Sequence, residues 1–155
     1  MMNPEVAAPP LVQRLVNDYG ASWIDAANVN AFTEGDGARV LFFCGDPIRF
    51  PEGLDVAVVL PELRAALSGG FAIGAVRAEC EDDVARRFGV QRWPSLVFFR
   101  DGSYTTTLAG MYDWNDYLTR VDQALRMPPS RKPGIGIPVV TLGGVPEMNE
   151  IEGVE

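Results

Sequence analysis

The chain has 155 residues, 47% of them hydrophobic and 22% charged, which supports one folded domain and excludes wholesale disorder. Its formal net charge is -8, so nucleic acid and anionic membranes are disfavoured as partners and basic partners are favoured. It contains no histidine, which excludes Ser-His-Asp and Cys-His catalysis and most zinc or iron sites.

The first residues lack a basic segment followed by an apolar core, and no apolar run is long enough to span a membrane. We therefore expect a cytoplasmic protein without membrane insertion. Its two cysteines, Cys44 and Cys80, lie far apart and form no Cys-x-x-Cys motif. The sequence thus predicts neither a disulfide framework nor a dithiol site, and no cofactor.

The first third of the chain predicts two helices and two strands. Apolar residues recur at helical spacing over 11–19, and Gly20 ends that helix. Residues 22–25 are a short strand candidate, and a brief helix capped by Asn28 follows. The continuous apolar run at 39–44 is typical of a central strand that is buried on both faces.

The middle of the chain predicts a loop, a kinked helix, a strand and a second helix. Residues 45–55 hold two prolines and two glycines and are expected to form a loop. A helix interrupted by Pro61 follows over 56–67, and residues 71–76 form a buried strand. The next helix begins with three acidic residues, which we interpret as capping of the helix dipole. These are Glu81, Asp82 and Asp83.

The stretch 89–102 organises the rest of the chain, because it runs from a helix stop through a turn to an apolar strand and an Asp-Gly hairpin. The second hairpin strand ends near Ala109, and Asp113 caps a last amphipathic helix. Repeated proline and glycine then break every periodicity. We therefore divide the chain into an N-terminal segment (1–10), a domain (11–126) and an irregular C-terminal tail (127–155).

This order of elements resembles the thioredoxin fold, an α/β fold with a central mixed sheet flanked by helices. In that fold a turn ends in a cis-proline just before the fourth strand. The resemblance implies that the Trp93–Pro94 bond is cis, although most prolines that follow a turn are trans.

The redox centre of thioredoxins is missing from the sequence. In thioredoxins, two cysteines lie at the start of the kinked helix and an aspartate lies in the central strand. In this sequence, the loop at 45–55 has no cysteine and the central strand is apolar. Cys44 is interpreted as a buried hydrophobe, and the acidic neighbours of Cys80 disfavour its thiolate. A monothiol redox enzyme that uses either cysteine stays open as an alternative. The pairs Asp82–Asp83 and Glu52–Asp55 are interpreted as solvated.

The resemblance to thioredoxins also implies where a peptide would bind. Their groove lies between the cis-proline turn and the glycine-containing loop before the last helix. Here it would be apolar, through Trp93 and Met111, with an acidic border suited to an extended apolar segment with arginines, although Trp93 can also be read as core. The predicted peptide-binding residues are Arg92, Trp93, Pro94, Gly110, Met111, Asp46, Glu52 and Asp55.

A combination of four features over residues 10–135 is more specific than the thioredoxin fold alone. These features are an apolar central strand, a cysteine-free proline-rich loop, the sequence of residues 88–102, and Gly-Met-Tyr-Asp-Trp at 110–114. The combination resembles the HyaE/HupG family of hydrogenase expression proteins. The resemblance implies a non-catalytic cytoplasmic chaperone for nickel-iron uptake hydrogenase. Its implied partner is the hydrogenase small-subunit precursor, recognised through its twin-arginine signal peptide before export, with other hydrogenase maturation proteins as further partners. An interaction module that assembles through its tail is a third interpretation.

Overall fold

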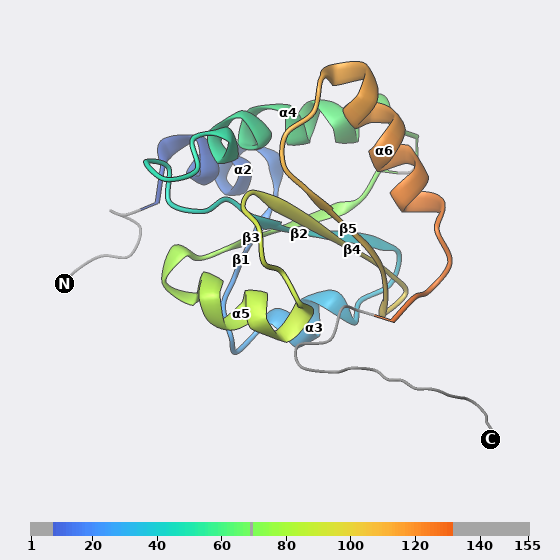
Figure 1. The fold of residues 1–155 in the computed structure, drawn as a ribbon. Coiled ribbons are helices and arrows are strands. Elements are labelled where there is room, and N and C mark those ends of the chain that lie inside the picture. Colours follow the sequence, from blue (N-terminus) through green and yellow to red (C-terminus); the bar gives the residue numbers. More distant parts are fainter. Residues whose placement is uncertain (1–7, 69, 132–155) are drawn as a thin grey trace.

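The structure of the protein is a computed structural model, which describes residues 8–68 and 70–131 (Figure 1). Most of the predicted C-terminal tail, including the edge contact expected at 137–140, lies outside the described residues. The division of the chain at residues 10 and 126 stays a prediction.

Helices and strands alternate along the described chain. In chain order they are α2 (Pro10–Tyr19), β1 (Ser22–Ile24), α3 (Val29–Thr33), β2 (Ala38–Phe43), α4 (Glu52–Ala66), β3 (Ala72–Val76), the 3-10 turn η1 (Ala78–Cys80), α5 (Glu81–Phe88), β4 (Ser95–Arg100), β5 (Ser103–Ala109) and α6 (Trp114–Arg126).

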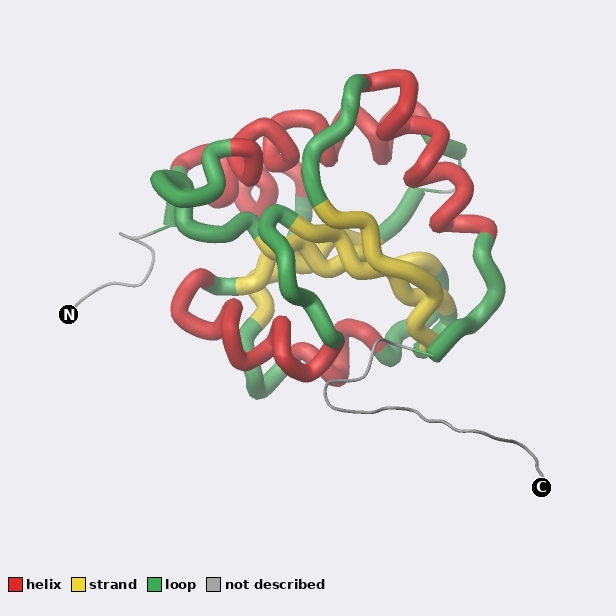
Figure 2. Tube along the Cα trace, in the orientation of Figure 1, coloured by secondary structure: helices red, strands yellow, loops and turns green. Residues whose placement is uncertain are grey.

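The five strands form one mixed sheet in the order β1-β3-β2-β4-β5. Strand β3 runs parallel to both β1 and β2, whereas β4 pairs antiparallel with β2 and β5. Helices α2, α4 and α6 cover one face of the sheet, and α3 and α5 cover the other (Figures 1 and 2). This is the predicted thioredoxin-like arrangement of a mixed sheet between helices.

The central strands are buried on both faces, as their unbroken apolar sequences predict. Alternate residues of β2 enter different clusters: Val40 and Phe42 pack with α2, α4 and α6, and Leu41 and Phe43 pack with α3 and α5. Strand β4 divides in the same way. Because successive side chains of a strand point to opposite faces, these strands contribute to two hydrophobic cores, one on each side of the sheet.

Helix α4 begins earlier than the sequence predicted, at Glu52 rather than at Val56. Pro51 has φ -61° and ψ -22°, so it enters the helix conformation, and Glu52 and Asp55 lie in the first turn, where the helix dipole favours acidic side chains. Residues 52–55, which the sequence analysis assigned to the loop, therefore form the first turn of α4. Pro61 lies inside α4, as expected.

The turn before β4 has the predicted geometry, because the Trp93–Pro94 peptide bond is cis. The backbone N–H of Gly110 donates to the carbonyl of Pro94 at 2.8 Å and holds the two loops together. Within residues 8–68 and 70–131, no helix is both long enough and apolar enough to cross a membrane.

Candidate functional site

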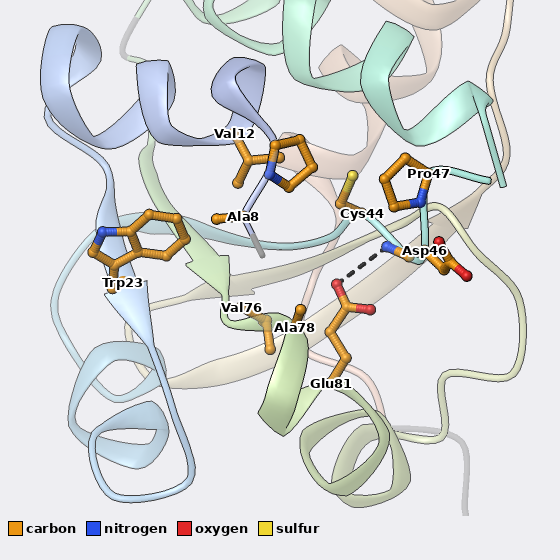
Figure 3. A pocket seen from close by; sticks show the side chains of 11 residues that line it. Ala8, Val12, Trp23, Cys44, Asp46, Pro47, Val76, Ala78 and Glu81 are labelled. Atoms are coloured by element: carbon orange, nitrogen blue, oxygen red, sulfur yellow. Dashed lines mark hydrogen bonds between the residues drawn. The ribbon is translucent and has the colours of Figure 1, made fainter. Parts of the chain in front are cut away.

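Two adjoining cavities open where the parallel strands β2 and β3 end. The first, which we call the apolar cavity, has a volume of about 230 Å³ (Figure 3). It lies between the start of α2, the end of β3 and the loop after β2. Its apolar walls are Pro9, Val12, Trp23, Cys44, Pro47 and Val76.

The second, which we call the polar cavity, has a volume of about 290 Å³. Its own walls are Arg49, Phe50, Asp82 and Trp93. Both cavities are also lined by Gly45, Asp46, Ala78 and Glu81. The two cavities are therefore neighbours that share one wall, and that wall contains two carboxyl groups.

Glu81 is a buried acidic residue of the shared wall, with only 8% of its surface exposed. Its Oε2 accepts a hydrogen bond from the backbone N–H of Gly45 at 3.1 Å, which Figure 3 shows as a dashed line. Its Oε1 accepts one from the indole N–H of Trp93, also at 3.1 Å. One carboxyl group thus joins the start of α5 to the loop after β2 and to the turn before β4.

Burial is the main cause that raises the pKa of Glu81, to about 7. The backbone and indole N–H donors oppose that rise, because they stabilise the ionised form, and the nearby Asp82 adds to it. The carboxyl group therefore changes its charge near neutral pH. Perturbed carboxyls of this kind gather at functional sites, although structural networks also produce them.

The loop 45–50 is ordered by its own hydrogen bonds and ring contacts. The backbone N–H of Ile48 donates to Asp46 Oδ1 at 3.1 Å, and that of Phe50 donates to the Asp46 carbonyl at 2.7 Å. The ring of Phe50 stacks on Trp93 with centroids 6.0 Å apart. Ile48 is left 89% exposed at the surface of this loop. Its chain neighbours Pro47 and Arg49 line the apolar and the polar cavity, respectively.

Gly45 is required at the junction of this loop with the turn before β4. Its φ is +82°, and a Cβ there would approach the Trp93 Cβ to 2.9 Å. Only glycine satisfies both conditions without strain. Strand β2 can therefore end directly against the Trp93 side chain.

The structure supports the interpretation of Cys44 as a buried hydrophobe. Its side chain is 6% exposed, and burial, with a smaller contribution from Glu81, raises the pKa of the thiol to about 12. A thiol in that state is a poor nucleophile at neutral pH. Cys80 is half-buried next to the start of α5, and both cysteines are free. In the described part of the chain, no group of three potential metal ligands is found.

The structure brings some of the predicted groove residues together and separates others. Trp93 and Asp46 both line the polar cavity, whereas Glu52 and Asp55 lie on the first turn of α4. Met111 packs against the core on the α2, α4 and α6 side, and Trp93 packs against the core on the other side. Of the remaining predicted residues, Arg92 is exposed, Pro94 is buried and Gly110 is partly buried. Peptide binding by the eight residues stays a prediction.

Glu81 is the residue that the sequence interpretation missed, because all three acidic residues were assigned to capping. A signal for it was present: Glu81, Val84, Ala85 and Phe88 follow the i, i+3, i+4, i+7 spacing of a buried helix face, and all four are buried. A carboxylate on the apolar stripe of a helix must be buried with hydrogen-bond partners.

The family model described as "Hydrogenase-1 expression protein HyaE" matches residues 11–117. The chain belongs to this family of hydrogenase expression proteins. A "Hydrogenase expression/formation protein HoxO" from Cupriavidus necator is 52% identical over 137 residues, which cover 87% of this chain and 85% of that protein. Another protein of that name, from Azotobacter vinelandii, is 41% identical over 119 residues, covering 75% of this chain and 78% of the relative.

The HyaE-family chain is also similar in fold to a solved thioredoxin, a single-residue mutant of the Halobacterium salinarum protein. The TM-score is 0.56 at 17% identity, with 70% of this chain and 94% of that chain covered. The family match places the protein in hydrogenase expression and maturation. The fold match shows the thioredoxin-like scaffold.

Proposed function

We propose that this HyaE-family protein is a non-catalytic chaperone in nickel-iron hydrogenase maturation that binds the hydrogenase small-subunit precursor through its twin-arginine signal peptide before export. The observation that carries the proposal is the family match over most of the folded domain. Action before export makes the protein cytoplasmic in this proposal. Other hydrogenase maturation proteins are its further candidate partners.

The chemistry of the site supports binding rather than thiol catalysis. The start of α4, where thioredoxins carry their dithiol, holds Glu52, Gly53, Leu54 and Asp55 instead. The nearest thiol, Cys44, packs in the core beside α4, and its pKa is raised to about 12, so it stays protonated at neutral pH. The rival function, a monothiol redox enzyme, would therefore depend on Cys80.

The surface around the two cavities suits a basic and apolar ligand. Acidic side chains line the shared wall and the polar cavity, while the apolar cavity and the exposed Ile48 offer hydrophobic contact. The whole chain has a net charge of -8, which favours encounter with a basic segment at low ionic strength. A signal peptide that combines arginines with apolar residues has this chemistry.

The test is a titration of the isotope-labelled protein with the signal peptide of its cognate small subunit, followed by backbone NMR shifts. We expect saturable shifts in the loop 45–50 and in the Trp93–Pro94 turn. A peptide in which both arginines are lysines is the matched control, and we expect it to bind more weakly because lysine lacks the planar fork that pairs with carboxylates. Absence of saturable shifts would reject recognition through the signal peptide.

A further inference from the structure

We propose that the apolar and polar cavities form one binding site for an extended segment, with an aliphatic side chain entering the apolar cavity and an arginine guanidinium two residues away entering the polar cavity. This inference rests on the proposed function and deepens it, because it names the site and the side-chain pattern that the site reads. It differs from the groove predicted on the sequence, in which Gly110 and Met111 form one side.

The apolar cavity has the size and lining for one aliphatic side chain. A volume of about 230 Å³ exceeds that of a single leucine side chain, and an aliphatic group would contact the Trp23 ring, Val12 and Val76. The indole of Trp23 is held in place by Arg77, whose guanidinium carbon lies 5.0 Å from its ring centroid. The wall that receives the ligand is therefore already formed.

The polar cavity has the charge and the ring surface for a guanidinium. Three carboxyl groups line it, those of Asp46, Glu81 and Asp82, against one cation, Arg49. Arg49 itself lies over the Phe50 ring at 5.1 Å, on the loop that bounds the cavity. Aromatic faces and carboxylates together are the surroundings that proteins use to hold arginine.

The shared wall sets the spacing of the two side chains. Because Asp46, Ala78 and Glu81 line both cavities, a segment crossing that wall meets them in succession. In an extended chain, side chains on the same side are two residues apart. The pattern is therefore one arginine and one aliphatic residue separated by a single residue.

The proposal is tested with capped tripeptides that carry arginine and leucine at the first and third positions, in both orders, with alanine between. Indole N–H signals report binding: Trp23 lies in one cavity and Trp93 in the other, and Trp114, on α6, is the internal control. We expect one order to shift the first two indoles saturably and leave Trp114 unmoved. Citrulline in place of arginine keeps the shape without the charge, and we expect it to bind about tenfold more weakly.

Two variants, the second with a matched control, locate the site. Ala78→Leu adds bulk at an exposed position of the shared wall and is expected to abolish the shifts. Asp82→Asn should weaken binding about threefold, as for an exposed ion pair, whereas the neighbouring Asp83→Asn should not, because Asp83 pairs with Arg86 and lines neither cavity. Equal binding of the citrulline peptide, or full binding to Ala78→Leu, would overturn the proposal.

The same variants separate this site from the proposed function. If the full precursor binds the original protein and Ala78→Leu equally well, the site is wrong and the function stands. If the tripeptide binds as described but the precursor does not, the function is wrong and the site stands.

Discussion

Glu81 lies in the first turn of α5, where the helix dipole favours an acidic side chain. Its side chain also lines both cavities. Its two acceptor oxygens satisfy the Gly45 N–H and the Trp93 indole N–H. Replacement by alanine would leave both donors without their partner in a buried position. This one side chain therefore holds the walls of the site together by hydrogen bonds and forms part of the cavity surface.

The pKa of about 7 makes a specific prediction of how Glu81 affects stability with pH. In the unfolded chain a glutamate ionises near pH 4.3, so between about pH 4.5 and 7 the folded state holds the proton more tightly and folding stability falls as pH rises. The total loss is about 4 kcal/mol. Glu81→Gln, which cannot ionise, removes this dependence.

The measurement is urea unfolding of the original protein and of Glu81→Gln at pH 5, 6, 7 and 8, with Asp83→Asn as the control for an exposed acid. The stability of the original protein relative to Glu81→Gln should fall by about 2 kcal/mol between pH 5 and pH 7 and then level off. A difference that stays constant with pH would show that the carboxyl does not titrate in this range.

Tyr117 provides a second prediction at this scale. Its hydroxyl is buried on α6 without a hydrogen-bond partner, and burial raises its pKa. Removing an unsatisfied buried hydroxyl while keeping the ring should be neutral or stabilising, by up to about 1 kcal/mol. Thermal or urea unfolding of Tyr117→Phe tests this, and a loss of more than about 1 kcal/mol would reveal a partner for the hydroxyl.

At the scale of elements, the decisive contact is between the start of α4 and the end of β2. A Cβ at Gly53 would collide with the carbonyl oxygen of Cys44, and the Cys44 sulfur would lie 2.9 Å away. Glycine therefore lets α4 begin directly against β2.

We expect Gly53→Ala to destabilise the protein although alanine is the better helix former. The collision is with backbone rather than with a flexible side chain, so the first turn of α4 must move, at a cost of about 2 kcal/mol or more. Unfolding in urea measures the loss. Gly53, unlike Gly70, has no positive φ, so its loss reports the collision; Gly70→Ala, where the nearest atom is 3.8 Å away but φ is +61°, measures backbone strain without a collision. A Gly53→Ala variant as stable as the original would contradict the contact.

The elements that could be predicted from sequence are those with a strong periodicity or a clear boundary. The apolar run of β2, the helix stop at Gly89 and the Asp101–Gly102 hairpin all lie where they were expected. The start of α4 could not be predicted, because proline and glycine normally break helices and the reason for Gly53 is a contact with another strand. The same holds for Glu81, whose partners are distant in sequence.

At the scale of the whole molecule, a thioredoxin-like scaffold carries an acidic two-cavity surface near the place of the redox centre. Two hydrophobic cores on either side of the sheet hold α4 and α5 in position, and the cavities open beside the starts of α2 and α5. The scaffold therefore does not depend on the dithiol for its stability. The chemistry of the site can change while the fold is kept.

We predict that Cys44 is not a redox-active thiol. At pH 8, Cys44 in a Cys80→Ser variant should react with a disulfide reagent on the order of a thousandfold more slowly than an exposed cysteine, because burial keeps it protonated. Unfolding in urea should restore the full rate. Rapid reaction in the folded state would support a monothiol enzyme that uses Cys44.

Recognition through the signal peptide is tested by calorimetry, which gives the dissociation constants of the full chain for the hydrogenase small-subunit precursor and for the same subunit without its signal peptide. We predict saturable binding of the precursor and a loss of at least about tenfold in affinity when the signal peptide is removed. Equal affinity for both forms would contradict recognition through the signal peptide, and no binding of either would contradict the chaperone function itself.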